Sequence, residues 1–302
     1  KIHPDLDMEA VCAYAKEKNV GVMLWVIWAT LDRQCEQALD QFAKWGIRGI
    51  KIDFMNRDDQ RMVNFYHRIA KEAAKRHMVV DFHGAYKPAG LRRAYPNVLT
   101  REGLIEVEQN GWSDQANPEH HALLPFLRMV AGPMDYIPGT MNNAQKHEFR
   151  PVGDRPMGLG TRAHDIALFV ILESPMQMLP DAPSDYYRER ECTEFIAQIP
   201  VEWDQTRVLE AQVGDYVVLA RRRGETWFVG AITDWEPRQF DLRFDFLDAG
   251  SYEMEFLRDG ANAATRAIDY KKEKRNVTAD TMMKIDLAPG GGWVARIYRP
   301  AR

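Results

Sequence analysis

The chain has 302 residues, of which 45% are hydrophobic and 28% are charged, with a formal net charge of −4 at pH 7. These proportions are close to the averages of globular proteins, so they exclude disordered, collagen-like and coiled-coil chains. The small negative charge gives no footprint for nucleic acid or for an anionic membrane surface, and no apolar run approaches the roughly 18 residues of a membrane span.

From Asp7 to about Pro200, short apolar runs alternate with long amphipathic patterns, which is typical of βα units around a parallel sheet. Helical patterns cover 7–18, 32–45 and 57–76. The strand-like runs end near Trp28, Phe54, Gly84, Gly103, Tyr136 and Leu179. The sequence therefore predicts an α/β fold with six βα units over residues 1–200, a portion of a (β/α)8 TIM-type barrel.

After Pro200 the pattern changes to alternating apolar and polar residues separated by Gly, Asp and Pro turns, as in an antiparallel sandwich. The predicted strands are 215–222, 226–233, 239–246, 251–257 and 292–299. The basic run at 271–275 is interpreted as a solvated turn. Residues 201–302 are therefore predicted to form a C-terminal β domain that packs against the barrel portion.

Polar residues gather at the ends of the predicted strands, where βα barrels build their active sites. Lys51 and Asp53 are two apart on one strand, so their side chains share a face. A lysine near a carboxylate favours the ionised form, as a nucleophile requires. The alternative is an ion pair that only closes the barrel mouth.

Further candidates follow the next strands. His83 ends one strand and is either a substrate or metal contact or a structural hydrogen-bonding residue. Glu102, Glu106 and Glu108 lie within seven residues, where mutual repulsion favours a general acid or a bound cation, although a solvated acidic loop has the same pattern. Asp135 is another carboxylate at an expected strand end.

An aspartate on one strand and a glutamate cluster two strands later are what a retaining glycosidase requires, namely a nucleophile facing an acid/base. Aromatic side chains near strand ends are able to stack on a sugar ring, although core packing explains each of them as well. They are Trp25, Trp28, Phe54, Tyr86, Trp112 and Tyr136.

Several segments resemble glycoside hydrolase family 97. They are GIKIDFMNRDDQ (49–60), VVDFHGAYKPAGLRRAYPNVLTREG (79–103) with the later Glu108, LPFLRMVAGPMDYIPG (124–139) and TRAHDIALFVILESPMQMLPDAPSDYY (161–187). The resemblance implies a calcium-dependent enzyme with an N-terminal β-sandwich, a catalytic (β/α)8 barrel and a C-terminal β domain. Members of that family are either inverting α-glucosidases or retaining enzymes typified by α-galactosidase.

The resemblance favours the retaining branch. Inverting members carry a glutamate base just after the His of the DFHG strand, whereas this chain has Gly84 and Ala85 after His83 and has Asp53 on the GIKID strand. By the family pattern Asp53 is the nucleophile and Glu108 the acid/base. The remaining expected contacts are Lys51, His83 and Asp135 for substrate, and Glu102 and Glu108 for Ca²⁺.

The expected function is therefore a retaining, exo-acting α-glycoside hydrolase, foremost an α-galactosidase, acting on an α-linked oligosaccharide or glycoside with calcium. The alternatives are an inverting α-glucosidase of the same family or a non-catalytic carbohydrate-binding fragment. The family analogy implies a periplasmic or secreted protein. Six strand-like units also predict that the first two barrel strands and the N-terminal sandwich lie outside these 302 residues.

Overall fold

The computed structural model describes residues 3–300, and these form two compact units. Unit 1 contains the residues up to Leu104 together with Ala131–Asp135. Unit 2 contains Ile105–Val130 together with the residues from Tyr136 onward. Among the described residues, no helix has the length and apolar character needed to cross a membrane.

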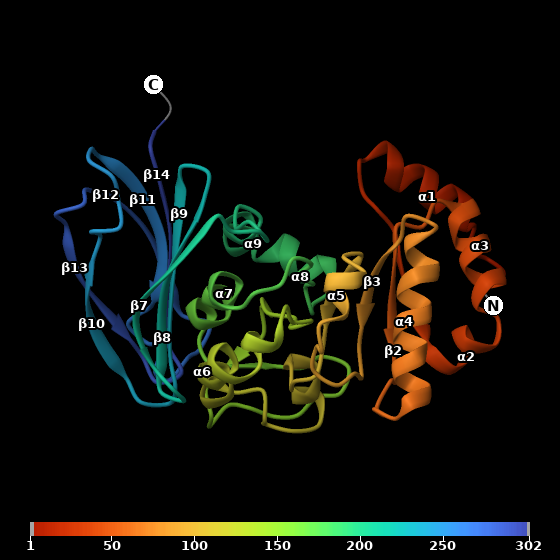
Figure 1. The fold of residues 1–302 in the computed structure, drawn as a ribbon. Coiled ribbons are helices and arrows are strands. Elements are labelled where there is room, and N and C mark those ends of the chain that lie inside the picture. The colour runs from red at the N-terminus through yellow and green to blue at the C-terminus, as the bar shows by residue number, and fades with distance from the viewer. Residues whose placement is uncertain (1–2, 301–302) are drawn as a thin grey trace. The chain divides into compact units, whose positions relative to one another are not determined.

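Unit 1 is built on a parallel sheet in which the strands follow chain order (Figure 1). The strands are β1 (Met23–Ile27), β2 (Gly49–Asp53), β3 (Val79–Phe82) and β4 (Val98–Arg101). The helices are α1 (Met8–Glu17), α2 (Trp28–Arg33), α3 (Cys35–Trp45), α4 (Gln60–Ala74) and α5 (Leu91–Ala94). The predicted βα alternation is confirmed over this unit.

The alternation of side chains along β2 separates the core of unit 1 from its polar face. Ile50 and Ile52 are fully buried in one cluster with Leu39 of α3 and Met62 of α4. Lys51 and Asp53 therefore point to the opposite face of the sheet. Two helices of unit 1, α1 and α4, begin at side-chain caps, because the carboxylates of Asp7 and Asp59 accept free backbone N–H groups of their first turns.

Two of the six predicted strands are not formed. The segment before Tyr136 contributes only an isolated parallel bridge between Met134 and Arg101, after the 3₁₀ turn η2 (Met129–Ala131). The segment 174–179 has no strand. Prolines explain both results, since Pro133 and Pro175 remove the backbone donors that a ladder needs. The prediction of a six-stranded incomplete barrel is therefore not confirmed.

Unit 2 opens with helices and short bridges. They are η1 (Val107–Gly111), α6 (Pro118–Leu127), β5 (Asn143–Ala144), β6 (Gly158–Leu159), α7 (Arg162–Ile171), α8 (Pro183–Arg188) and α9 (Arg190–Ile196). Every residue of α7 is buried. Gly230 permits this close packing, because a Cβ there would lie 3.0 Å from the carbonyl oxygen of Ala167.

The rest of unit 2 is an antiparallel sandwich, as predicted. Its six-stranded sheet has the order β12-β11-β14-β9-β8-β7, and β10 pairs with β13 in a second sheet. The strands are β7 (Gln205–Gln212), β8 (Tyr216–Arg223), β9 (Thr226–Thr233), β10 (Arg238–Arg243), β11 (Tyr252–Asp259), β12 (Tyr270–Val277), β13 (Met282–Leu287) and β14 (Gly292–Tyr298). Val229 and Ala231 pack inside the sandwich with Leu242 and Ile285, while Gly230 faces α7.

The basic run at 271–275 is not a turn, and that prediction is wrong. It lies in β12 at the edge of the six-stranded sheet, where Lys272 pairs with Glu255 on β11 at 3.0 Å. Lysines are common on edge strands because their charge prevents pairing with another chain. The three cysteines are free thiols and are buried.

Candidate active site

A row of side chains crosses the four strands of unit 1 on the polar face. The strand register places Trp25, Lys51, Asp81 and Thr100 beside one another on β1 to β4. Thr100 Oγ1 donates to Asp81 Oδ1 at 2.7 Å, and Lys51 Nζ lies 3.7 Å from Asp81 Oδ2. The sheet therefore fixes the lysine of β2 beside the carboxyl group of β3 in this row.

Asp135 joins the row from the short segment after Pro133. Its Oδ2 accepts a hydrogen bond from His83 Nδ1 at 2.7 Å and lies 2.8 Å from Lys51 Nζ. Burial raises the pKa of Asp135, but the hydrogen bond from His83 and the charge of Lys51 outweigh burial, so the pKa is lowered. Asp135 is therefore an anion that orients both His83 and Lys51.

Asp81 has the opposite protonation behaviour. Its carboxyl group is fully buried, and burial together with the negative charge of Asp135 raises its pKa well above the usual range. Asp81, His83 and Asp135 could also hold a metal by their mutual spacing. The ammonium group of Lys51 already supplies the positive charge there, so we interpret this group as an ion-pair network that positions His83.

Asp53, at the end of β2, is 9% exposed and has a donor on each carboxylate oxygen. Trp25 Nε1 donates to Oδ2 at 2.9 Å, and the backbone N–H of Phe54 donates to Oδ1. Gly84 passes directly beside this group with φ of +57°, and a Cβ there would lie 3.0 Å from Asp53 Oδ1 and 2.9 Å from the Phe54 nitrogen. The space next to the carboxylate therefore exists only because residue 84 is glycine.

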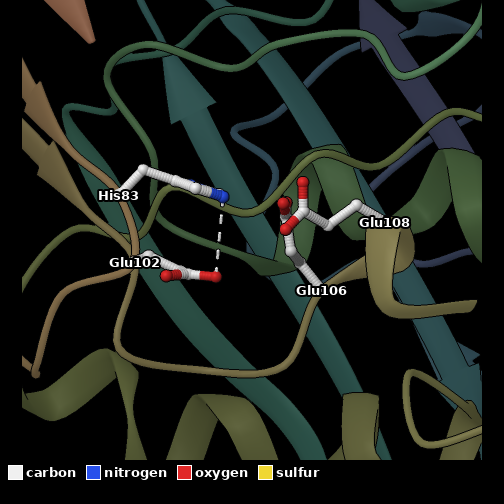
Figure 2. A group of neighbouring side chains, drawn as sticks. All are labelled: His83, Glu102, Glu106 and Glu108. Carbon is white, nitrogen blue, oxygen red and sulfur yellow. Dashed lines mark ion pairs between the residues drawn. The ribbon is translucent and has the colours of Figure 1, made fainter. Parts of the chain in front are cut away.

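Glu102 follows β4 and is also buried. Its Oε1 lies 3.7 Å from His83 Nε2, the pair joined by the dashed line in Figure 2. Beside it the loops after β2, β3 and β4 line an open pocket of about 470 Å³. The pocket is lined by 56–58, 84–86 and 102–104. The expected convergence of strand-end loops is therefore present within unit 1.

Glu106 and Glu108 belong to unit 2, and Figure 2 shows their carboxylates close together. Glu106 is the N-cap of η1 and forms a reciprocal capping box with Gln109. Glu108 is in the first turn of η1. Because Glu102 and Glu108 are six residues apart, the chain alone keeps their Cα atoms within about 20 Å, whatever the placement of the two units.

The structure brings the three predicted substrate contacts together, because Lys51 and His83 each contact Asp135. The pairing of Lys51 with Asp53 stays a prediction, as do the catalytic and metal roles of the other residues. Asp81 is the participant that the sequence analysis missed. Its signal was a lone acid in the apolar run VVDF, two residues before His83 and thus on the same face.

Two family models match the chain. The model described as glycoside hydrolase 97 matches residues 1–104, and the model described as glycosyl-hydrolase 97 C-terminal, oligomerisation, matches residues 202–298. Together they cover about two thirds of the sequence. The second match spans nearly all of the β domain expected after Pro200.

Named relatives agree with these models. The chain is 44% identical over 97% of its length to a "Retaining alpha-galactosidase" from Bacteroides thetaiotaomicron, of which it covers 45%. It is 32% identical over 96% of its length to a "Probable retaining alpha-galactosidase" from Streptomyces bingchenggensis, of which it covers 43%. The chain thus spans about half the length of the curated relatives it matches.

A solved structure is similar over the whole chain. It is a glycoside hydrolase family 97 enzyme from Pseudoalteromonas sp. in complex with panose, with a TM-score of 0.90 and 32% sequence identity. The match covers 100% of this chain and 50% of that enzyme. The two units therefore have the fold of the corresponding half of that enzyme.

Proposed function

The chain belongs to glycoside hydrolase family 97, and on that premise we propose that its site serves a retaining, exo-acting α-galactosidase. One observation carries the proposal, which is the arrangement of Asp53 and Gly84. Asp53 is held by two donors at the end of β2, and the glycine leaves the space beside it open. A fixed, accessible carboxylate is what a double-displacement mechanism requires of its nucleophile.

The same geometry argues against the inverting alternative. Inverting members are expected to carry a glutamate base immediately after the histidine that matches His83. Here that position is Gly84, where even a Cβ would press on the backbone of Phe54 at 2.9 Å. A glutamate side chain therefore does not fit unless β2 and its loop move.

In the proposed mechanism, Asp53 attacks the anomeric carbon of the α-linked terminal sugar while Glu108 donates a proton to the leaving glycosidic oxygen. The bond from the carbon to Asp53 forms as the bond to the leaving oxygen breaks. Water, deprotonated by Glu108, then displaces Asp53 and releases the sugar with retained configuration. Retention requires the two carboxyl groups to be about 5 Å apart in the working enzyme.

Lys51, His83 and Asp135 are proposed to bind sugar hydroxyls. The hydrogen bond from Nδ1 to Asp135 leaves His83 Nε2 directed toward Glu102. Lys51 is held by Asp135 at 2.8 Å, so its ammonium is fixed before substrate arrives. Fixed groups of this kind lower the cost of orienting a substrate.

Calcium is proposed as the cofactor, with Glu102 and Glu108 as protein ligands. The donor chemistry fits, because Ca²⁺ prefers carboxylate oxygens and Glu102, Glu106 and Glu108 supply three such groups within seven residues. When bound, the ion supplies positive charge that polarises the sugar and balances the carboxylates.

The proposal is tested by removing the nucleophile from the full-length protein. Asp53→Gly is expected to abolish hydrolysis of an aryl α-galactoside, and azide is expected to restore turnover and yield a β-galactosyl azide, because the anion enters the space that the carboxylate leaves. Asp114→Gly, at an exposed loop aspartate, is the matched control and should retain activity. Full activity of Asp53→Gly without azide would reject the role of Asp53.

A further inference from the structure

Trp25 lies in the middle of β1, the strand at one edge of the parallel sheet of unit 1. Its one polar group, the indole N–H, donates a hydrogen bond of 2.9 Å to Asp53 Oδ2 on the neighbouring strand. The polar edge of the ring is therefore committed to the proposed nucleophile.

Phe54 completes the arrangement from the other side. It has a left-handed backbone with φ of +62°, which is rare for a residue with a large side chain and typically costs about 1–3 kcal/mol. The residue donates its backbone N–H to Asp53 Oδ1. Its own ring is 55% exposed and meets the ring of Trp25 edge to face, with centroids 5.8 Å apart. Strain of this kind persists where surrounding contacts hold it, and here they surround a single carboxylate.

We propose that Trp25 is a positioning residue for the retaining reaction: its indole N–H, opposite the backbone N–H of Phe54, fixes the plane of the Asp53 carboxylate toward the sugar. Each oxygen of Asp53 then has one donor and keeps one lone pair available. The inference rests on the proposed function, because it assigns Trp25 to the nucleophile of that mechanism.

This role differs from simple stacking of Trp25 on the sugar. A stacking residue acts on the substrate and would be needed whichever nucleophile is used. A residue that acts through Asp53 becomes irrelevant once the carboxylate is removed and a small anion takes its place. A double-mutant cycle separates these two roles, since coupling appears only when two residues act together.

The experiment uses four versions of the full-length protein: wild type, Trp25→Phe, Asp53→Gly, and the double variant. The last two are measured with azide. Trp25→Phe should lower kcat on an aryl α-galactoside about 10- to 100-fold with little change in KM, the size expected for one hydrogen bond to a charged group. In the azide-rescued Asp53→Gly background, the same substitution should change kcat by less than about twofold.

Trp45→Phe is the matched control, because Trp45 lies at the end of α3, stacks on Phe42 with ring centroids 6.0 Å apart, and should leave kcat unchanged. If Trp25→Phe fails to fold, benzothienylalanine at position 25 replaces the indole N–H with sulfur and keeps the ring shape. Loss of the same size in both backgrounds, or wild-type kcat for Trp25→Phe, would overturn the inference while leaving Asp53 as nucleophile. Activity of Asp53→Gly without azide would overturn the proposed function, and the inference with it.

Discussion

Gly84 shows how a single missing side chain shapes the site. Its backbone is left-handed, and a Cβ would meet Asp53 Oδ1 at 3.0 Å. Gly90, in the same loop, also has positive φ, but a Cβ there would meet nothing within 4 Å. The two glycines therefore share the conformational cost of substitution and differ only in what surrounds them.

Replacing each glycine by alanine should distinguish the cost of a side chain in left-handed backbone from the effect of filling the space beside Asp53. Gly90→Ala is expected to lower the free energy of unfolding by about 1–2 kcal/mol, the cost of placing a side chain in left-handed backbone, and Gly84→Ala is expected to lower it more, because its Cβ also meets the Phe54 backbone nitrogen at 2.9 Å. Only Gly84→Ala should also lower kcat, by at least about tenfold, because it displaces Asp53 and Phe54. Equal kcat in the two variants would show that the space beside Asp53 is not needed.

Glu102 is the residue on which the calcium proposal depends most. Glu102→Gln should weaken Ca²⁺ binding, measured by calorimetry, by about 10- to 100-fold, because it removes one charged ligand from a small set. EDTA should lower activity, and added Ca²⁺ should restore it. Glu119→Gln, at an exposed glutamate of α6, is the control. Unchanged Ca²⁺ affinity in Glu102→Gln would remove Glu102 from the site.

The sequence predicted where individual side chains lie when the alternation along a strand alone determines their face. Alternation along GIKID places Lys51 and Asp53 on the face opposite Ile50 and Ile52, as found. The hydrogen bond from Trp25 to Asp53 was not predictable, because it joins residues 28 apart across two strands. Sequence alone offered only an aromatic residue near a strand end.

At the scale of elements, a buried chain of hydrogen bonds links α6, α7 and the loop before β14. His164 Nδ1 donates to the Gly291 carbonyl at 3.1 Å, His121 Nδ1 donates to His164 Nε2 at 2.9 Å, and the Tyr136 hydroxyl donates to His121 Nε2. Because the Gly291 carbonyl can only accept, it fixes the direction of each hydrogen bond in this series. Both imidazoles must therefore be neutral for the elements to stay joined.

This series of hydrogen bonds predicts that the folding stability of unit 2 falls at acidic pH. Burial lowers the pKa of His164 from 6.5 to about 4, so on acidification the unfolded state takes up the proton first. The stability that neutral His164 contributes is complete above pH 6.5 and is lost as the pH falls toward 4. His121 contributes to stability in the same direction, because burial and the nearby His164 lower its pKa well below 6.5.

The measurement is the unfolding free energy of wild type and His164→Asn at pH 7 and pH 5. The advantage of wild type over the variant should shrink by about 2 kcal/mol, at roughly 1.4 kcal/mol per pH unit below the unfolded pKa. Asp165, whose pKa burial raises to about 7, has the opposite sign, but it is present in both proteins and cancels. A constant difference between the proteins would mean that His164 is not held neutral.

Elements with strong periodicity were predictable, and those defined by their neighbours were not. The amphipathic pattern at 57–76 gave α4, and alternation at 226–233 gave β9. The charged run in β12 lacks apolar alternation and is a strand only because β11 offers a partner. The segment near Leu179 is apolar, yet prolines keep it out of any ladder.

At the scale of the whole molecule, sequence predicted a parallel βα part and an antiparallel sandwich, and both are present. It did not predict that the fifth parallel strand is reduced to one bridge at Met134. Composition and periodicity report local preferences, whereas strand pairing depends on what lies alongside.

The boundary between Leu104 and Ile105 also passes through the glutamate cluster, so the two proposed catalytic carboxylates, Asp53 and Glu108, lie on different units.

Substrate choice is a property of the assembled enzyme. Aryl α-galactoside should be hydrolysed with higher kcat/KM than aryl α-glucoside, in agreement with the names of the two curated relatives. Competition between the two substrates in one reaction measures the ratio directly. A preference for the glucoside would move the proposal to the α-glucosidase branch.

The most direct test of the central claim is the anomeric configuration of the first sugar released. Proton NMR during early turnover of an α-galactoside distinguishes the two anomers before mutarotation mixes them. Double displacement through Asp53 predicts that α-galactose appears first and the β anomer accumulates only later. Initial release of β-galactose would contradict the retaining mechanism and the assignment of Asp53 as nucleophile.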